Sequence, residues 1–220
     1  MSHHWKALVR RRGKDAFILS LHRQARLLDV GCGNDSPRRV KSLNPGLYYI
    51  GLDVQDYEQS NGSTSLANEY RITTPEKFLS TIQIEKRSMD AVLSAHNLEH
   101  CAERYSVLRA ICGTLKAGGK LYLSFPSEAS VDRPSRRGTL RYHDDVTHID
   151  APPSWMQVLQ ELTSSGMEIE FSARRYRPLI PCALGLLLEP WSALSRRVGP
   201  LGSTWALYGF ESVIWARKKD

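Results

Sequence analysis

The chain has 220 residues, of which 41% are hydrophobic and 24% are charged, and its formal net charge at pH 7 is +7. This composition is typical of one globular domain, and no stretch approaches the roughly 20 apolar residues of a membrane-spanning helix. The four cysteines are scattered without a C-x-x-C pair, which argues against a structural zinc site and a disulfide framework. Since residues 1–6 are polar and unlike a signal peptide, we expect a cytoplasmic protein.

The excess of positive charge lies largely in residues 1–26 and 174–220. Basic ends can attract nucleic acid, an anionic lipid or an acidic substrate, or they can form an ordinary solvated surface. No nucleic-acid-binding motif is present, and aromatic residues are not regularly interleaved with the basic ones. We therefore expect no nucleic-acid partner.

Apolar segments alternate with amphipathic ones along the first half of the chain. In chain order we predict a basic amphipathic helix over 5–24, a buried strand over 26–30, a helix over 36–43 and a strand over 48–53. A polar loop follows over 54–68. A helix then runs from about 74 to 84, with Thr74 as its N-cap and Pro75 in its first turn, and a strand covers 89–95.

The second half continues this alternation and then becomes less regular. We predict a helix over 103–115, a strand over 120–125, a polar loop over 127–150, a helix from 152 to 164 and a strand over 167–172. The segment 178–195 is apolar but interrupted by proline and glycine, and 205–217 reads as a final strand. We therefore expect one doubly wound α/β domain over 1–220, with a mostly parallel Rossmann-like sheet and an antiparallel edge strand.

A glycine turn follows the first predicted strand, in the sequence Asp29-Val30-Gly31-Cys32-Gly33. Glycines let the backbone turn sharply and approach a ligand closely, because they carry no Cβ. Asp53 ends the next predicted strand, where a carboxylate can accept hydrogen bonds from both hydroxyls of a ribose. The pattern predicts a nucleoside-containing cofactor at the C-terminal edge of the sheet.

The glycine spacing discriminates between two kinds of cofactor. A dinucleotide fold has G-x-G-x-x-G, but the third glycine position is Ser36 here, and Asp35 places negative charge where a pyrophosphate would lie. The acidic Asp29 suits a cofactor with a cationic end instead. Asp35 also precedes Pro37 as a candidate N-cap of the next helix.

The segment Asp29 to Gly33 resembles the first motif of class I S-adenosylmethionine-dependent methyltransferases, although that motif usually has a further glycine where this chain has Asp35. Residues 90–100 and 115–124 resemble the fourth strand with its following turn and the loop with the fifth strand of the same class. Residues 143–148 resemble a segment of its small-molecule and cell-surface-glycan subgroup. The resemblance covers about 25–172. It implies S-adenosylmethionine as cofactor, bound by Asp29, Gly31, Cys32, Gly33, Asp53, Val54, His96 and Asn97.

Methyl transfer to a hydroxyl needs a base, and histidine titrates near neutral pH. We expect the catalytic residues to be His148, His100 and Asp145, while His143 and Asp144 are weaker candidates. Glu99, His100, Asp144 and His148 could together bind a divalent ion, although we predict no metal. Four arginines of the loop 127–150 are candidates for clamping an anionic group on the acceptor: Arg133, Arg136, Arg137 and Arg141.

The apolar segment 179–188 lies among arginines within 174–197. It is either a core or lid helix, or an interfacial segment that contacts a membrane peripherally to reach a lipid- or glycan-linked acceptor. Our prediction is an O-methyltransferase for a small-molecule or glycan-type acceptor. Two alternatives stay open, a nicotinamide-dependent oxidoreductase on a similar sheet and an inactive module that only binds the cofactor. The sequence does not indicate the oligomeric state.

Overall fold

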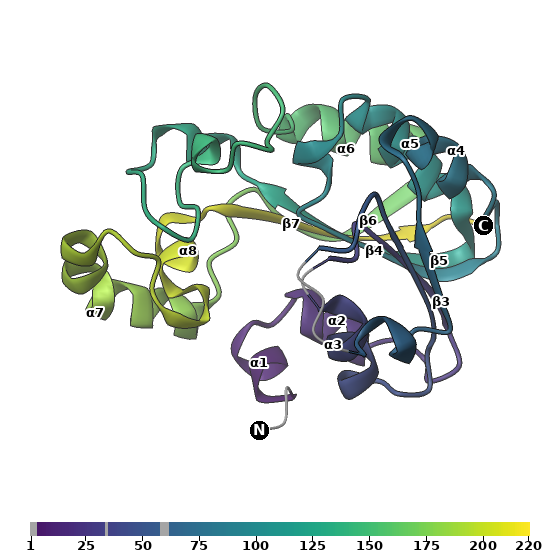
Figure 1. The fold of residues 1–220 in the computed structure, drawn as a ribbon, viewed down its shortest axis with the longest axis horizontal. Coiled ribbons are helices and arrows are strands. Elements are labelled where there is room, and N and C mark those ends of the chain that lie inside the picture. Colours follow the sequence, from purple (N-terminus) through teal and green to yellow (C-terminus); the bar gives the residue numbers. More distant parts are fainter. Residues whose placement is uncertain (1–3, 34, 58–61) are drawn as a thin grey trace.

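The computed structural model of the chain describes residues 4–33, 35–57 and 62–220. One seven-stranded sheet carries the described part of the chain (Figure 1). Its strands are β1 Arg26–Val30, β2 Tyr48–Asp53, β3 Glu69–Ile72, β4 Met89–Ala95, β5 Leu115–Pro126, β6 Met167–Ala173 and β7 Glu211–Lys218. The helices are α1 His4–Val9, α2 Lys14–Leu19, α3 Ser36–Leu43, α4 Pro75–Gln83, α5 Arg104–Thr114, α6 Trp155–Ser164, α7 Leu179–Ser195 and α8 Ser203–Tyr208.

The strand order is β3-β2-β1-β4-β5-β7-β6. The first five strands in this order pair in parallel, whereas β7 runs antiparallel to both β5 and β6. The predicted doubly wound sheet and its antiparallel edge are thereby confirmed. The order reverses between β1 and β4, so the crevice beyond their carboxyl ends is where an open α/β sheet binds its ligand.

Both faces of the sheet are covered. Leu28 packs in a core with Phe78 of α4 and Ile111 of α5, while its neighbour Leu27 packs with Phe17 of α2 on the opposite face. Successive side chains of a strand point to opposite faces, so strands buried on both sides must be apolar throughout. Figure 1 shows α4, α5 and α6 over one face, α2 and α3 over the other, and α7 with α8 beyond one end of the sheet.

The structure corrects the predicted N-terminal helix. Residues 5–24 form two short helices rather than one, because the chain turns at Arg12, whose φ is +70°, and at Gly13. The predicted loop 54–68 is followed by a strand that we did not predict, β3. This strand is short and polar, and it lies at the edge of the sheet, so its burial pattern is weak.

Two further differences concern the C-terminal part. The interrupted segment 178–195 forms one helix, α7, which tolerates Pro190 in its interior. The predicted strand 205–217 begins later, at Glu211, because residues 203–208 form α8 and the chain then turns at Gly209, whose φ is +61°.

Asp35 occupies the N-cap position of α3, but its side chain makes no capping hydrogen bond. No described helix is long and apolar enough to cross a membrane.

Candidate active site

The turn after β1 brings Gly31 against Asn97, which follows β4. Gly31 has φ +77°, a left-handed conformation that favours glycine. A Cβ at this position would lie 2.7 Å from Oδ1 of Asn97 and 2.8 Å from its Cβ. Two of the residues predicted to bind the cofactor are therefore in contact. The restriction on Gly31 comes from its own backbone and from the Asn97 side chain.

Asp53 and Val54, at the end of β2, meet Gly33 of the turn after β1. Oδ2 of Asp53 accepts the Gly33 N–H at 2.9 Å, and Oδ1 accepts the Val54 N–H at 2.7 Å. Burial raises the pKa of Asp53, and these backbone hydrogen bonds oppose the rise. A carboxylate oxygen has two lone pairs, so each oxygen keeps capacity for a further donor such as a ribose hydroxyl.

Asp29 lies deeper, at the end of β1, and is 1% exposed. Its Oδ2 accepts hydrogen bonds from the Ser36 hydroxyl at 2.5 Å and the Tyr49 hydroxyl at 2.8 Å. Burial raises the pKa of Asp29, and the positive charge of Lys14 opposes that rise. Ser36 occupies the position where a dinucleotide fold has its third glycine, and here its side chain has a structural role that a glycine could not fill.

Cys32 belongs to the same turn, but its side chain is fully buried. A Cβ on Gly51 of β2 would lie 2.9 Å from the Cys32 Sγ, and burial raises the pKa of the thiol. Any contact of Cys32 with a ligand would therefore come from its backbone. The carboxylates of Asp29 and Asp53 fit a cofactor that has ribose hydroxyls and a cationic group. They would repel a pyrophosphate.

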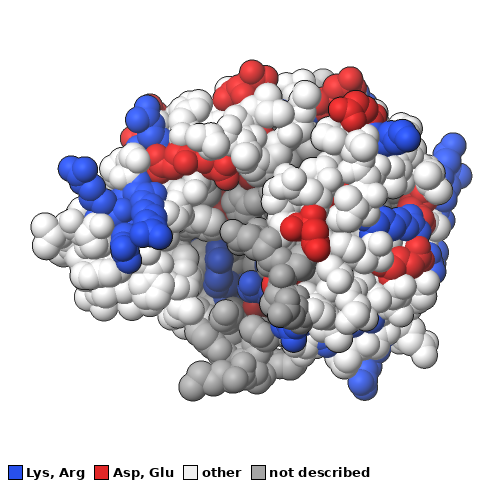
Figure 2. Space-filling model, in the orientation of Figure 1, with Lys and Arg blue, Asp and Glu red and all other residues white. Residues whose placement is uncertain are grey.

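A cavity of about 330 Å³ opens over the carboxyl ends of β4 and β5 and the start of β7. Of the residues predicted to bind the cofactor, His96 lines this cavity, whereas the glycine turn and Asp53 do not. Figure 2 shows this face of the molecule hollowed near its centre, with basic side chains inside the hollow. The lining includes all three predicted catalytic residues, together with basic, acidic and aromatic groups from distant segments. Among them are Arg10, Lys14, His96, Glu99, His100, Thr139, Asp145, His148, Trp205, Phe210 and Glu211.

His96 lies between two buried carboxylates. Its Nδ1 is 3.0 Å from Oε1 of Glu99, and its Nε2 is 3.4 Å from Oε1 of Glu211. The other carboxylate oxygen of Glu211, Oε2, accepts a hydrogen bond from Arg10 at 2.7 Å. Burial alone would lower the pKa of His96, but the two carboxylates outweigh burial and raise it to about 10. For Glu211 the directions are reversed. Burial alone would raise its pKa, but Arg10 and His96 outweigh burial and lower it to about 2. Both ring nitrogens of His96 thus face carboxylates.

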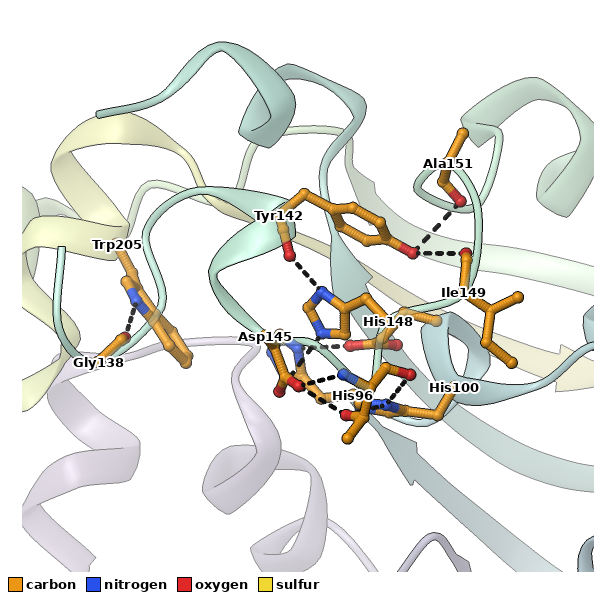
Figure 3. A network of polar contacts seen from close by, with 11 residues as sticks. His96, His100, Gly138, Tyr142, Asp145, His148, Ile149, Ala151 and Trp205 are labelled. Carbon is orange, nitrogen blue, oxygen red and sulfur yellow. Dashed lines mark hydrogen bonds and ion pairs between the residues drawn. The ribbon is translucent and has the colours of Figure 1, made fainter. Parts of the chain in front are cut away.

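The loop 127–150 folds back and brings His148 next to His100 (Figure 3). Nδ1 of His148 is 2.6 Å from the backbone carbonyl of Tyr142. Since a carbonyl oxygen can only accept, Nδ1 carries the proton, and in the neutral ring Nε2 keeps the lone pair. Oδ2 of Asp145 lies 3.8 Å from Nε2, and burial lowers the pKa of His148.

His100 is held by the same loop. Its Nδ1 is 3.2 Å from the carbonyl of Thr147 and 3.0 Å from the hydroxyl of that residue, which in turn donates to Asp145 at 2.6 Å. Nδ1 of His100 is therefore a donor as well, and its Nε2 is the basic nitrogen of the neutral ring. The three predicted catalytic residues are brought together by one hydrogen-bond network.

Glu99, His100 and His148 each offer a ligand atom, and these atoms lie within 4.8 Å of one another. Oε2 of Glu99 is buried and makes no hydrogen bond to the described residues. This cluster therefore has the chemistry of a divalent-metal site as well as that of a proton acceptor. Asp144, the fourth residue of the predicted metal set, does not belong to this cluster. Its carboxylate accepts the backbone N–H groups of Arg136 and Arg141.

The structure places the predicted arginine clamp outside this cavity. Arg133, Arg136, Arg137 and Arg141 do not line the cavity, and the guanidinium of Arg136 is hydrogen-bonded to Glu189 and Ser192. The basic groups of the cavity come from Arg10, Lys14 and Arg39 instead. Sequence reasoning also missed Glu211, although a lone carboxylate at the start of an apolar strand could have indicated a buried partner.

Comparisons with known proteins agree with this geometry. A family model described as a methyltransferase domain matches residues 28–123. The chain is 27% identical to 27-O-demethylrifamycin SV methyltransferase of Amycolatopsis mediterranei over 60% of this chain and 51% of that protein, so it spans about half the length of that relative. It is 24% identical to a ubiquinone biosynthesis O-methyltransferase of Xanthomonas axonopodis pv. citri, over 78% of this chain and 70% of that protein. An S-adenosylmethionine-dependent methyltransferase from Mesorhizobium loti superposes with a TM-score of 0.61 at 17% identity, covering 92% of this chain and 96% of that one.

Proposed function

We propose that this chain, which carries a methyltransferase domain of the class I, S-adenosylmethionine-dependent kind, methylates a hydroxyl group of a small-molecule or glycan-type acceptor. The observation that carries the proposal is the orientation of His148. The Tyr142 carbonyl fixes the proton on Nδ1, so that Nε2 is the basic nitrogen of a residue that lines the cavity together with His96. A base next to a cofactor pocket is what O-methylation requires of a protein.

The cofactor, when bound, supplies an electrophilic methyl group on a sulfonium ion. Asp53 would hold the ribose hydroxyls, with Gly33 and Val54 holding the Asp53 carboxylate in place. Asp29 provides negative charge toward the cationic half, and Asn97 closes the turn over Gly31. Alignment of the reacting groups accounts for much of the rate in such a transfer, so these residues act mainly by positioning.

His148 takes the acceptor proton on Nε2 in this proposal. The ring that has gained the proton is stabilised by Asp145 at 3.8 Å, and Asp145 itself is held by Thr147. Because burial lowers the pKa of His148, the ring is neutral at pH 7 and ready to accept. His100 shares the network and is the second candidate for this role.

The acceptor side of the cavity combines aromatic and acidic groups. Trp205 and Phe210 lie with ring centroids 4.8 Å apart, and both line the cavity with Glu99 and Asp145. Flat apolar faces beside hydrogen-bond acceptors suit a hydroxylated ring, either of a sugar or of a phenolic compound. One of the relatives named above is called an O-methyltransferase, and the other is named for a 27-O-demethylated compound that it methylates, which supports oxygen as the acceptor atom.

Cofactor selectivity tests the proposal against its two alternatives. We expect S-adenosylhomocysteine to raise the melting temperature of the purified chain and NAD(H) to leave it unchanged. Stabilisation by NAD(H) alone would favour the oxidoreductase. Stabilisation by S-adenosylhomocysteine without label transfer from S-adenosylmethionine to any hydroxylated acceptor pool would favour the inactive module.

A further inference from the structure

Helix α7 presents an apolar face to solvent. Its exposed positions recur at the spacing of one helical face, and each side chain on that face is apolar. Leu194 is 89% exposed, Leu179 83% and Leu187 78%. The stripe consists of Leu179, Ile180, Ala183, Leu186, Leu187, Pro190, Trp191 and Leu194.

The polar residues of α7 face inward instead. Glu189 accepts hydrogen bonds from Arg136 at 2.9 and 2.6 Å, and Ser192 is fully buried against Arg136 and Thr204. Gly185 touches α8 so closely that a Cβ there would lie 2.3 Å from the Ser203 carbonyl oxygen. These contacts fix the rotation of α7, so the apolar stripe cannot turn into the core.

The stripe is bounded by positive charge at both ends. Arg175 and Arg177 precede α7, Arg196 and Arg197 follow it, and all four are exposed. The only carboxylate within residues 174–203 is Glu189, which is paired with Arg136. In Figure 2 basic side chains gather next to an uncharged surface at the end of the molecule where Figure 1 places α7.

This charge arrangement discriminates between occupants. If two copies paired through their α7 helices in antiparallel fashion, the arginines before one helix would meet the arginines after the other, and like charges would repel. An anionic surface complements both ends at once. α7 has 17 residues and is therefore about 25 Å long, which suits a helix lying flat in a lipid interface, and Trp191 is of the residue type enriched there.

We infer that the exposed face of α7 docks on an anionic lipid membrane, with the stripe in the interface and the four arginines on the headgroups. The inference does not depend on methyl transfer. It has a structural link to the site, because the backbone of Arg137 in the loop 127–150 pairs with Arg196 and Val198 just after α7. Docking would therefore place the loop that carries His148 close to the membrane surface.

Vesicle co-sedimentation tests this inference on the full chain. We expect binding to phosphatidylcholine vesicles that contain phosphatidylglycerol, and at least tenfold weaker binding to phosphatidylcholine alone. The double variant Leu186→Glu, Leu187→Glu should weaken binding tenfold or more, and so should Arg196→Glu, Arg197→Glu. Matched controls are Ile84→Glu, an exposed apolar residue after α4, and Lys86→Glu, an exposed cation, both of which should bind like the wild type.

Circular dichroism of each variant, whose altered side chains are exposed, checks that the fold is retained. Brominated lipid should quench the tryptophan fluorescence of the wild type, and it should quench that of Trp191→Phe less. Binding that is lost in salt but unaffected by the leucine variants would overturn the inference, because it would be charge attraction without insertion. Dimers that dissociate in Leu186→Glu, Leu187→Glu, with no vesicle binding, would assign the face to a second copy and also overturn it. A wild-type protein that is monomeric and binds no vesicle would also overturn the inference.

Discussion

The imidazole rings of His100 and His148 lie with their centroids 4.9 Å apart, although one follows β4 and the other ends the loop after β5. Both Nδ1 atoms face backbone carbonyls of that loop, which leaves both Nε2 atoms as the basic nitrogens. Two proton acceptors with the same tautomer thus lie beside Glu99, whose buried Oε2 makes no hydrogen bond within the described part of the chain. This pairing makes the loop part of the catalytic apparatus in our proposal.

His148→Ala should reduce turnover about 10²–10⁴-fold, the usual loss when a general base is removed. Affinity for S-adenosylhomocysteine should stay unchanged, because the residue serves the acceptor side. His143→Ala is the matched control, since that exposed histidine of the same loop does not line the cavity. Turnover and calorimetry on both variants check the prediction, and equal turnover in His148→Ala would assign the base elsewhere.

The pH dependence of turnover follows from the burial of His148. Because burial lowers the pKa of this ring from its usual 6.5, the base is neutral at and above pH 6.5. The acid limb of the kcat/KM profile should therefore fall below pH 6.5, with a plateau above it. The profile should lose that limb in His148→Gln. A limb that survives the substitution would point to His100 or another group.

Asp53→Ala should weaken binding of S-adenosylhomocysteine by about 1–3 kcal/mol, the cost of leaving the ribose hydroxyls without a charged acceptor. Asp56→Ala serves as control, because this exposed carboxylate accepts a hydrogen bond from Tyr70 and does not line the cavity. Calorimetry on folded protein measures the effect. Wild-type affinity in Asp53→Ala would show that the ribose lies elsewhere.

Gly31→Ala should lower the free energy of unfolding by about 1–3 kcal/mol, since it combines a left-handed backbone with a clash against Asn97. In the double variant with Asn97→Gly the loss should be smaller than the sum of the single losses, because the clash is then relieved. Gly113→Ala is the control, as nothing lies within 4 Å of a Cβ there. Strictly additive losses in urea denaturation would contradict the contact.

The buried pair of His96 and Glu211 predicts two limits of stability. The pKa of His96 is raised from 6.5 to about 10, so its contribution is complete below pH 6.5 and is lost as pH rises toward 10. The pKa of Glu211 is lowered from 4.5 to about 2, so its contribution is complete above pH 4.5 and is lost as pH falls toward 2. The free energy of unfolding, measured by urea denaturation, should fall less between pH 6.5 and 10 in His96→Gln than in the wild type. Identical limbs would contradict the ion pair.

The sequence predicted the parts of the site that follow strand ends. Asp29, Asp53 and Asn97 come directly after or at the end of apolar strands, and a parallel sheet brings such positions together at one edge. The existence and order of these strands depend on local apolar patterns, which are visible in one sequence.

The contacts that the sequence did not reveal are long-range. Arg10 reaches Glu211 across nearly the whole chain. The place of Glu211 at the start of an apolar strand indicates a buried partner, but nothing in the sequence identifies Arg10 as that partner. The tautomer of His148 depends on a carbonyl of Tyr142, and backbone groups leave no signal in residue types. The sequence also did not reveal that the apolar face of α7 is exposed to solvent, because an apolar segment has the same pattern whether it faces the core or the solvent.

The central claim is most directly tested by methyl transfer itself. The purified wild type would be incubated with S-adenosylmethionine labelled on the methyl group and a panel of hydroxylated phenols and sugars, with His148→Ala and His143→Ala in parallel. We predict label on an acceptor oxygen with the wild type and His143→Ala, and about 10²–10⁴-fold less with His148→Ala. Label on nitrogen or carbon, or equal transfer by the wild type and His148→Ala, would contradict the account.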